Sequence, residues 1–326
     1  MKTPLKFLQA VTFCAAGLVL IDGDLTAHAQ PGTEAWVQRY SHDIGSDDRA
    51  AKVITDADGE VIVAGTSDAG ITGSDWLIIK YSSTGVPLWT NRYDGPGNGD
   101  DFVRAVAVDG NGKVLVTGYS TGKGSRYDYA TIAYSKAGVP LWTNRYNGTG
   151  NNDDAANGLA MNGNGNVFVT GQSQGSSSGW DYATIAYSGA GVPLWTNRYR
   201  GPANSEDMAS AVAVDGNGRV FVTGHMGQEY GTIAYSGTGV PLWTNRYAGI
   251  ANAMAVDSNG NVFVTGESAV GGTTIAYSNA GVPLWTNSSS GRGYAMAVGG
   301  NGNVFVTGST ASDYETVGYS NSGVPL

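Results

Sequence analysis

The stretch Gly-Val-Pro-Leu-Trp-Thr-Asn-Arg-Tyr at residues 85–93 decides the fold, because the chain repeats it. Further complete copies occupy residues 138–146, 191–199 and 239–247. A shortened copy begins at Gly281, residues 36–40 match its second half, and residues 323–326 match its start. Copies this similar, recurring every 42–53 residues, indicate one supersecondary unit stacked on itself.

Each repeat contains four segments with the composition of short β-strands. In the third repeat these are residues 158–161, 167–170, 182–188 and 192–199. Val, Ile, Tyr and Thr are enriched in them, and Gly or Asn bounds them, which is typical of hairpins. No segment after residue 29 shows the apolar period of a helix. Four antiparallel strands per repeat predict the blade of a β-propeller.

Six blades are expected, because the Val-Phe-Val-Thr-Gly segment or a variant of it ends at Gly65, Gly118, Gly171, Gly224, Gly266 and Gly308. We therefore predict an all-β, six-bladed β-propeller of four-stranded antiparallel blades. Residues 34–40 are expected to act as the outer strand of blade six and close the ring, in competition with residues 323–326. The recurrent tryptophans are expected to pack between blades: Trp36, Trp89, Trp142, Trp195, Trp243 and Trp285.

The first 29 residues have the layout of a secretory signal peptide. Lys2 and Lys6 precede an apolar run at residues 7–21, and Ala27-His28-Ala29 is a small-residue cleavage signal. We therefore expect residues 30–326 to form a single β-propeller domain that is secreted, extracellular or periplasmic. The only cysteine, Cys14, lies in the signal segment, so the mature chain is cysteine-free.

The composition argues against several classes of partner. The net charge is −9 and no run of Lys or Arg occurs, which disfavours nucleic acid. No later apolar stretch approaches the ~20 residues of a transmembrane helix, so no membrane insertion is expected. The histidines, His28, His42 and His225, lack metal-ligand spacing. We predict no cofactor, no metal site and no catalytic constellation.

The variation in repeat length points to a binding face. The intervals between successive repeat tryptophans are 53, 53, 53, 48 and 42 residues. All of the change falls in two connections: from the fourth strand to the next first strand, and from the second strand to the third. In an antiparallel meander both emerge at the same end of the strands, which we call the long-loop face. Variable loops on a constant scaffold commonly bind ligands. The predicted site is the part of this face formed by blades one to three with part of blade four.

Acidic residues recur at this face. Pairs precede the first strand at Asp47-Asp48, Asp100-Asp101, Asp153-Asp154 and Glu206-Asp207, and a second series precedes the third strand at Asp75, Asp128, Asp181, Glu229 and Asp313. The pairs either accept backbone N–H groups at the blade junctions or form a rim that binds a cation or a polyhydroxyl ligand. The Asp-Gly-Asn-Gly turn at residues 109–112 fits hairpin geometry, because the distal Glu of an EF-hand loop is missing.

Two tryptophans, Trp76 and Trp180, depart from the repeat. The sequence places them in the long connections between second and third strands, near Arg126 and Tyr127. They either stack on a sugar or grip a peptide, or they cover the edge of their own blade. The predicted ligand-binding set comprises Trp76, Trp180, Arg126, Tyr127, Asp48, Asp101, Asp154 and Asp207.

The repeat also resembles a known family. Asp-Tyr-Ala-Thr-Ile-Ala-Tyr-Ser, then Gly-Val-Pro-Leu-Trp, then Ala-Val-Asp-Gly-Asn-Gly-Asn-Val-Phe-Val-Thr-Gly is similar to the bacterial SBBP-type β-propeller repeat, from residue 36 to residue 326. The resemblance implies a secreted or surface protein and assigns no activity.

Three functions remain open from the sequence. The first is a secreted, non-enzymatic propeller that binds a glycan, peptide or protein through the long-loop face. The second is a carbohydrate-active hydrolase or lyase that uses carboxylates such as Asp101 and Asp154. The third is a structural surface module with no small ligand.

Overall fold

The computed structural model describes residues 34–326 except 42–46, 69, 178 and 202–204. All elements named below lie in the unit Trp36–Leu326. The predicted signal peptide, residues 1–29, lies outside the described residues. Among the residues described, no helix is both long enough and apolar enough to cross a membrane.

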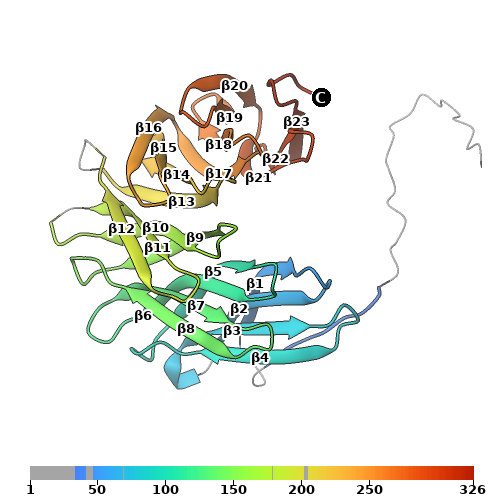
Figure 1. Cartoon of the computed structure of the whole chain (residues 1–326), viewed down its shortest axis with the longest axis vertical. Coiled ribbons are helices and arrows are strands. Elements are labelled where there is room, and N and C mark those ends of the chain that lie inside the picture. The colour runs from blue at the N-terminus through green and yellow to red at the C-terminus, as the bar shows by residue number, and fades with distance from the viewer. Residues whose placement is uncertain (1–33, 42–46, 69, 178, 202–204) are drawn as a thin grey trace, which may run out of the picture. The chain divides into compact units, whose positions relative to one another are not determined.

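The described chain is almost entirely β-structure (Figure 1). Blades one and two comprise β1 (Asp48–Thr55), β2 (Val61–Asp68), β3 (Ser74–Tyr81) and β4 (Pro87–Tyr93), then β5 (Asp101–Val108), β6 (Val114–Thr121), β7 (Tyr127–Tyr134) and β8 (Pro140–Tyr146). Blades three and four comprise β9 (Asp154–Met161), β10 (Val167–Gln174), β11 (Trp180–Tyr187) and β12 (Pro193–Tyr199), then β13 (Asp207–Val214), β14 (Val220–Met226), β15 (Glu229–Tyr235) and β16 (Pro241–Ala248). Blades five and six comprise β17 (Ile250–Val256), β18 (Val262–Ser268), β19 (Gly271–Tyr277) and β20 (Pro283–Ser289), then β21 (Arg292–Val298), β22 (Val304–Ser309) and β23 (Tyr314–Tyr319). One short 3-10 helix, η1 (Gly70–Thr72), precedes β3.

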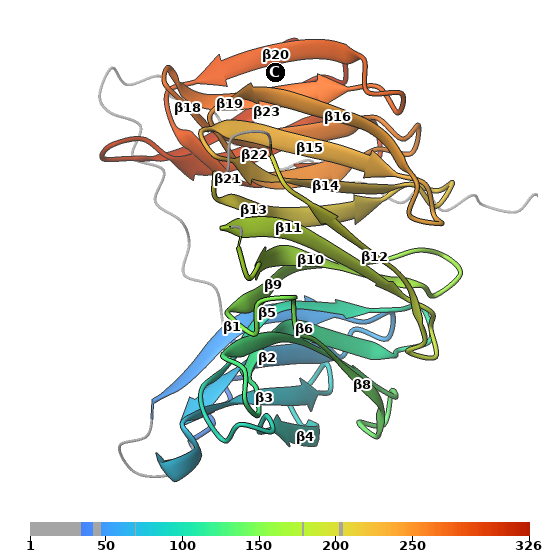
Figure 2. The same ribbon diagram turned by 90° about the vertical axis from the view of Figure 1, so that its left-hand side faces the viewer.

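Each blade is an antiparallel meander whose strands pair in chain order. Five sheets have four strands, and the sixth has three, β21-β22-β23. Figure 2 shows the strands of each blade side by side in a twisted sheet. The first strands of successive blades contact one another from β1 to β21. The predicted all-β, six-bladed β-propeller is confirmed.

The predicted ring-closing strand differs from what the structure shows. Residues 34–41 form no strand, and the fourth position of blade six holds one isolated bridge between Tyr319 and Pro325. Trp36 packs instead against Tyr81 of blade one, with ring centroids 5.8 Å apart, and its indole N–H donates to the carbonyl of Ser83 at 3.1 Å. Trp89, in the outer strand of blade one, packs in the same way on blade two. Trp36 therefore makes with blade one the contacts that an outer-strand tryptophan makes with the following blade.

The core consists of layers between successive blades, as predicted for the recurrent tryptophans. Trp142 of β8 lies 5.9 Å from Tyr187 of β11, and its indole N–H donates to the carbonyl of Gly189 at 3.2 Å. The ring also covers Gly191, which has a positive φ of 82°. A Cβ there would lie 2.5 Å from the Trp142 ring, so this position accepts only glycine. The repeated Gly-Val-Pro-Leu-Trp phrase therefore joins each blade to the next.

A second recurrent glycine lies in the second strand of each blade. A Cβ on Gly118 in β6 would lie 1.9 Å from the carbonyl oxygen of Phe102. The register of β5 shifts at this point, between Val103 and Ala105, which marks a β-bulge. The glycine that ends the Val-Phe-Val-Thr-Gly segment is therefore required by the close approach of the first strand.

Candidate functional site

Both variable connections emerge at one end of the strands, as predicted, because every sheet is an antiparallel meander. They also contact each other. The amide of Gly97, which follows β4, donates to the carbonyl of Thr121 at the end of β6 at 3.2 Å. The guanidinium of Arg126, which precedes β7, donates to Asp153, which precedes β9, at 2.9 Å. The long connections of blades one to three therefore fold onto one another.

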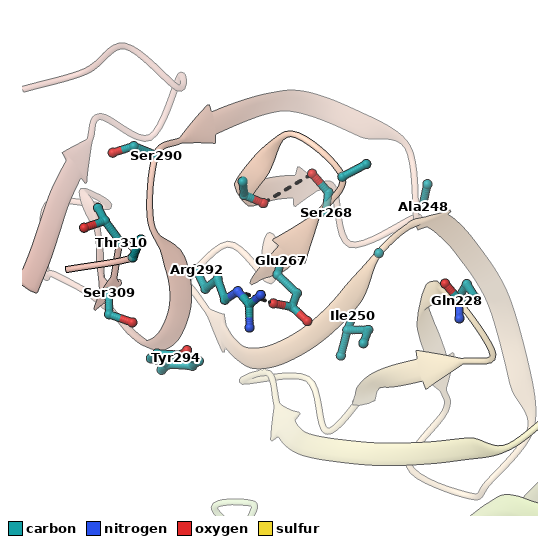
Figure 3. Close-up of a pocket in the computed structure, with 14 residues that line it drawn as sticks. Gln228, Ala248, Ile250, Glu267, Ser268, Ser290, Arg292, Tyr294, Ser309 and Thr310 are labelled. Atoms are coloured by element: carbon teal, nitrogen blue, oxygen red, sulfur yellow. Dashed lines mark hydrogen bonds and ion pairs between the residues drawn. The ribbon is translucent and has the colours of Figure 1, made fainter. Parts of the chain in front are cut away.

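A cavity of about 850 Å³ opens on the long-loop face between blades four, five and six (Figure 3). This volume is in the range of small-molecule sites. The structure thus places the cavity on the predicted face but in its short-loop half, whereas the sequence pointed to blades one to three. The lining residues come from strand ends and short turns: Gln228, Ala248, Ile250, Glu267, Ser268, Ser290, Arg292, Tyr294, Ser309 and Thr310.

The cavity contains a charged pair and an exposed aromatic ring. Arg292 Nε lies 2.6 Å from Glu267 Oε2, and the arginine side chain is 63% exposed. Figure 3 shows Arg292 directed toward Glu267, with Tyr294 beneath them in this view. Tyr294 is 53% exposed. The pair offers charged donors and acceptors, and the ring offers an apolar face with a polar tip.

The cavity exists because two glycines replace acidic residues. Aligned on the β-bulge, Gly249 and Gly291 stand where blade two has Asp101. In blade two, the Asp101 carboxylate accepts the amide of Gly95 at 2.6 Å and that of Thr121 at 3.0 Å. These bonds fold the long connection over the strand ends. With glycine and a shortened connection, the strand ends of blades five and six stay uncovered.

The predicted acidic residues serve this structural purpose. Asp101, Asp154 and Asp207 are fully buried, and each accepts the amide of a glycine six residues earlier. Asp48 is half-buried. Burial and the nearby charge of Asp75 raise the pKa of Asp101 to about 6, and burial also raises the pKa of Asp154. The expectation that Asp101 and Asp154 act on a carbohydrate is not supported, because both carboxylates are closed off from solvent.

Trp76 requires a correction. It lies within β3 and not in a connection, and its side chain is fully buried. Its ring packs 5.3 Å from that of Tyr93. The sequence already indicated this position, because Trp76 follows Asp75 just as the buried Tyr129 follows Asp128 in blade two. Trp76 therefore fills the buried aromatic position of the repeat and cannot stack on a ligand without leaving the core.

The remaining predicted residues lie in blades two and three, in the half of the face with long connections (the long-loop half), and none of them lines the cavity. Trp180 is the first residue of β11 and is half-buried. Tyr127 begins β7 and packs edge-on against Tyr119 with centroids 5.0 Å apart. Arg126 is exposed and pairs with Asp153. The structure brings Arg126 and Tyr127 together as neighbours, and a ligand role for these residues and Trp180 stays a prediction.

The lining residues of the cavity were missed from the sequence, although one signal was present. Tyr294 aligns, on the bulge, with Ala51 of blade one and with polar residues in the remaining blades: Arg104, Asn157, Ser210 and Asn252. An aromatic residue at a position that is small or polar in every other blade departs from the repeat. Glu267 and Arg292 carried no such signal, because their pairing joins β18 to β21 of the next blade.

Within the part of the chain that the structure describes, two groups of three carboxylates are close enough to share a cation. Asp56, Asp58 and Glu60 form one group. Lys80 Nζ lies 2.8 Å from Asp56 and 2.7 Å from Glu60, and Lys136 pairs with Asp58, so two ammonium groups offset two of its three negative charges. The other group, Asp75, Asp94 and Asp101, lies between blades one and two.

Comparisons with known proteins agree with the architecture. The family model described as a beta-propeller repeat, SBBP, matches residues 246–272. The regulatory protein FlaEY of Caulobacter vibrioides is 26% identical over 226 residues, which is 57% of this chain and 23% of that protein. The chain thus spans less than a quarter of this relative's length.

Solved structures show the same fold. A putative 6-phosphogluconolactonase from Bacteroides uniformis has a TM-score of 0.56 at 12% identity, covering 84% of this chain and 82% of that one. Virginiamycin B lyase from Staphylococcus aureus has a TM-score of 0.54 at 11% identity, covering 86% and 87%. At such low identity the likeness concerns the fold alone.

Proposed function

Because the chain carries the SBBP-type β-propeller repeat, a scaffold of constant strands and variable connections, we propose that it is a non-catalytic binding module for a glycan. The ligand binds in the cavity between blades four, five and six. The observation that carries this proposal is the 850 Å³ cavity itself, with Glu267, Arg292 and Tyr294 in its lining.

The chemistry of the lining suits a polyhydroxyl ligand. The Glu267 carboxylate accepts hydrogen bonds and the Arg292 guanidinium donates them, so together they match adjacent hydroxyl groups of a sugar. The half-exposed ring of Tyr294 supplies the apolar surface on which a sugar face stacks. Hydroxyl side chains at Ser290, Ser309 and Thr310 add neutral polar partners.

The same lining favours binding over hydrolysis. Glycoside hydrolases generally place two carboxyl groups on either side of the scissile bond. Among the described lining residues, Glu267 is the one carboxylate, and Arg292 already engages it at 2.6 Å. The predicted signal peptide supports a location outside the cytoplasm, which completes the proposal: a secreted glycan-binding propeller.

Glycan arrays followed by calorimetric titration of the purified full chain test this function. We expect Arg292→Ala and Tyr294→Ala to weaken glycan binding at least tenfold, while Tyr294→Phe retains most of it. Tyr314→Ala, an exposed aromatic of blade six that does not line the cavity, is the matched control and should bind normally.

Three results would contradict the proposal. The first is a chain that binds no glycan, or binds one with unchanged affinity in both cavity variants. The second is a peptide-library ligand whose binding depends on Arg292 and Tyr294, which would assign the cavity to peptides. The third is release of new reducing ends from a bound polysaccharide, which would show an enzyme.

A further inference from the structure

Three carboxylates converge where blade one meets blade two, on the long-loop face and separate from the cavity. Asp75 lies at the start of β3, Asp94 directly follows β4, and Asp101 begins β5. One oxygen of each lies within 4.8 Å of the others. Calcium binds oxygen ligands at roughly 2.3–2.6 Å, so three oxygens at this mutual spacing can contact one ion.

The cluster has an excess of negative charge. Arg92 is the cation that pairs with it: its Nε donates to Asp75 Oδ2 at 2.7 Å, while its terminal nitrogens donate to Ser67. Three carboxylates against one guanidinium leave two uncompensated charges. Asp75 and Asp101 are both buried, where solvent screens this repulsion poorly.

An independent observation also points to a missing ligand. The second oxygen of Asp75, Oδ1, is buried and has no hydrogen-bond partner, and the residue as a whole is 3% exposed. A buried carboxylate oxygen without a donor is unfavourable, and at Asp75, unlike at Asp128, two uncompensated charges add to the cost that a cation would relieve. The backbone approaches Asp101 closely at Gly95, where a Cβ would lie 2.0 Å from Ser120 Oγ and 2.9 Å from Asp101 Oδ1.

The other long-loop blades carry the same framework with different third residues. In blade two the buried pair is Asp128 and Asp154, and the residue after the fourth strand is Asn147. In blade three that residue is Arg200. The residue after the fourth strand is thus acidic, neutral or basic in three otherwise similar junctions. Of these three, only the junction with Asp94 carries two uncompensated negative charges.

We propose that Asp75, Asp94 and Asp101 bind one calcium ion at the junction of blades one and two. The donor set is oxygen only, which suits a hard divalent cation. The ion joins the third strand of blade one, through Asp75, to the first strand of blade two, through Asp101. It thereby fixes the connection formed by residues 94–100.

Calcium titration of the EDTA-treated full chain, by calorimetry and by terbium luminescence, tests the site. Trp76 is adjacent to Asp75 in sequence and serves as the sensitiser for terbium. We expect one calcium per chain and a rise in melting temperature with calcium. Asp94→Asn, which copies blade two, should weaken binding at least tenfold, and Asp94→Arg, which copies blade three, should abolish it.

Two further variants control this experiment. Asp58→Asn alters the lysine-paired group of Asp56, Asp58 and Glu60 and should leave calcium binding unchanged. Asn147→Asp completes a third carboxylate in blade two, where Asp128 Oδ1 is likewise buried without a partner, and should raise the stoichiometry from one to two. Because Asp94 is exposed, its substitution should not unfold the chain.

The outcomes separate clearly. Loss of binding in both Asp94 variants with normal folding supports the site, and a second ion in Asn147→Asp supports its charge logic. Absence of calcium binding to the unmodified chain at millimolar calcium would overturn the proposal. So would equal affinity in Asp94→Arg, or a preference for magnesium with no measurable calcium binding.

Discussion

Blades one to three and blades four to six share strands, bulges and inter-blade tryptophans, yet they differ at one end of the strands. In the first half, buried acids such as Asp101 hold long connections down over the face. In the second half, blade four keeps Asp207, whereas in blades five and six Gly249 and Gly291 replace those acids and the connections are short. The repeat therefore builds the scaffold, and the length of two connections decides whether the face is covered or hollow.

The two halves also differ in how firmly each blade holds its outer strand. Arg145 donates to Ser120, Asp128 and the hydroxyl of Tyr93 on the preceding blade. In blade four, Arg246 forms an ion pair with Glu229 that is partly open to solvent. In blade five, Ser288 takes the arginine position.

The largest expected effect concerns the corrected tryptophan. Trp76→Ala removes a fully buried ring and should lower the free energy of unfolding by about 3–5 kcal/mol. Trp180→Ala, at the half-exposed start of β11, should cost about 1 kcal/mol. Urea denaturation measures both. Equal losses would show that Trp180 is as much a part of the core as Trp76.

The next effect is the pH dependence of stability that Asp101 gives to the half with long connections, blades one to three. Asp101 has a folded pKa of about 6 against 3.8 as its ordinary value, a difference worth roughly 3 kcal/mol. Because the folded state holds the proton more tightly, this group's contribution to stability is full below pH 3.8 and is lost as pH rises through 6. Carboxyl ¹³C NMR of the EDTA-treated chain should show Asp101 titrating near 6; titration near 4 would contradict its desolvation.

A smaller difference is expected between the two arginine positions. Arg145→Ala removes charged hydrogen bonds from a buried aspartate and should destabilise the chain by about 2 kcal/mol. Arg246→Ala, at the equivalent place in blade four, should cost less than about 1 kcal/mol because its pair is partly exposed. Thermal and urea unfolding of both variants compare the halves directly, and a larger loss for Arg246→Ala would reverse the comparison.

The smallest effect on stability belongs to the cavity. Arg292→Ala should change the free energy of unfolding by no more than about 0.5 kcal/mol, since its side chain is 63% exposed. Its effect on glycan binding should nevertheless be at least tenfold. A variant that loses stability and binding together would indicate that the Glu267–Arg292 pair holds the blades and not a ligand.

The candidate site was only partly predictable. The sequence placed both variable connections on one face, because the meander and the two connections follow from repeat spacing alone. The cavity lies on that face, but in the half that the sequence did not single out, because how the long connections pack is not visible in the sequence. Of the two interpretations of Asp101 and Asp154, the structure shows the one in which they accept backbone N–H groups, and only the structure shows that both are buried.

By itself, the sequence determined the number of blades, the antiparallel strands and the inter-blade role of the tryptophans, because each repeat encodes the same local pattern and contacts its neighbour at a fixed offset. Only the tertiary structure decided where the face is hollow, that Glu267 meets Arg292, and that Asp75, Asp94 and Asp101 converge. These contacts join residues of different strands and blades, and their distances depend on how the connections fold, which no periodicity records.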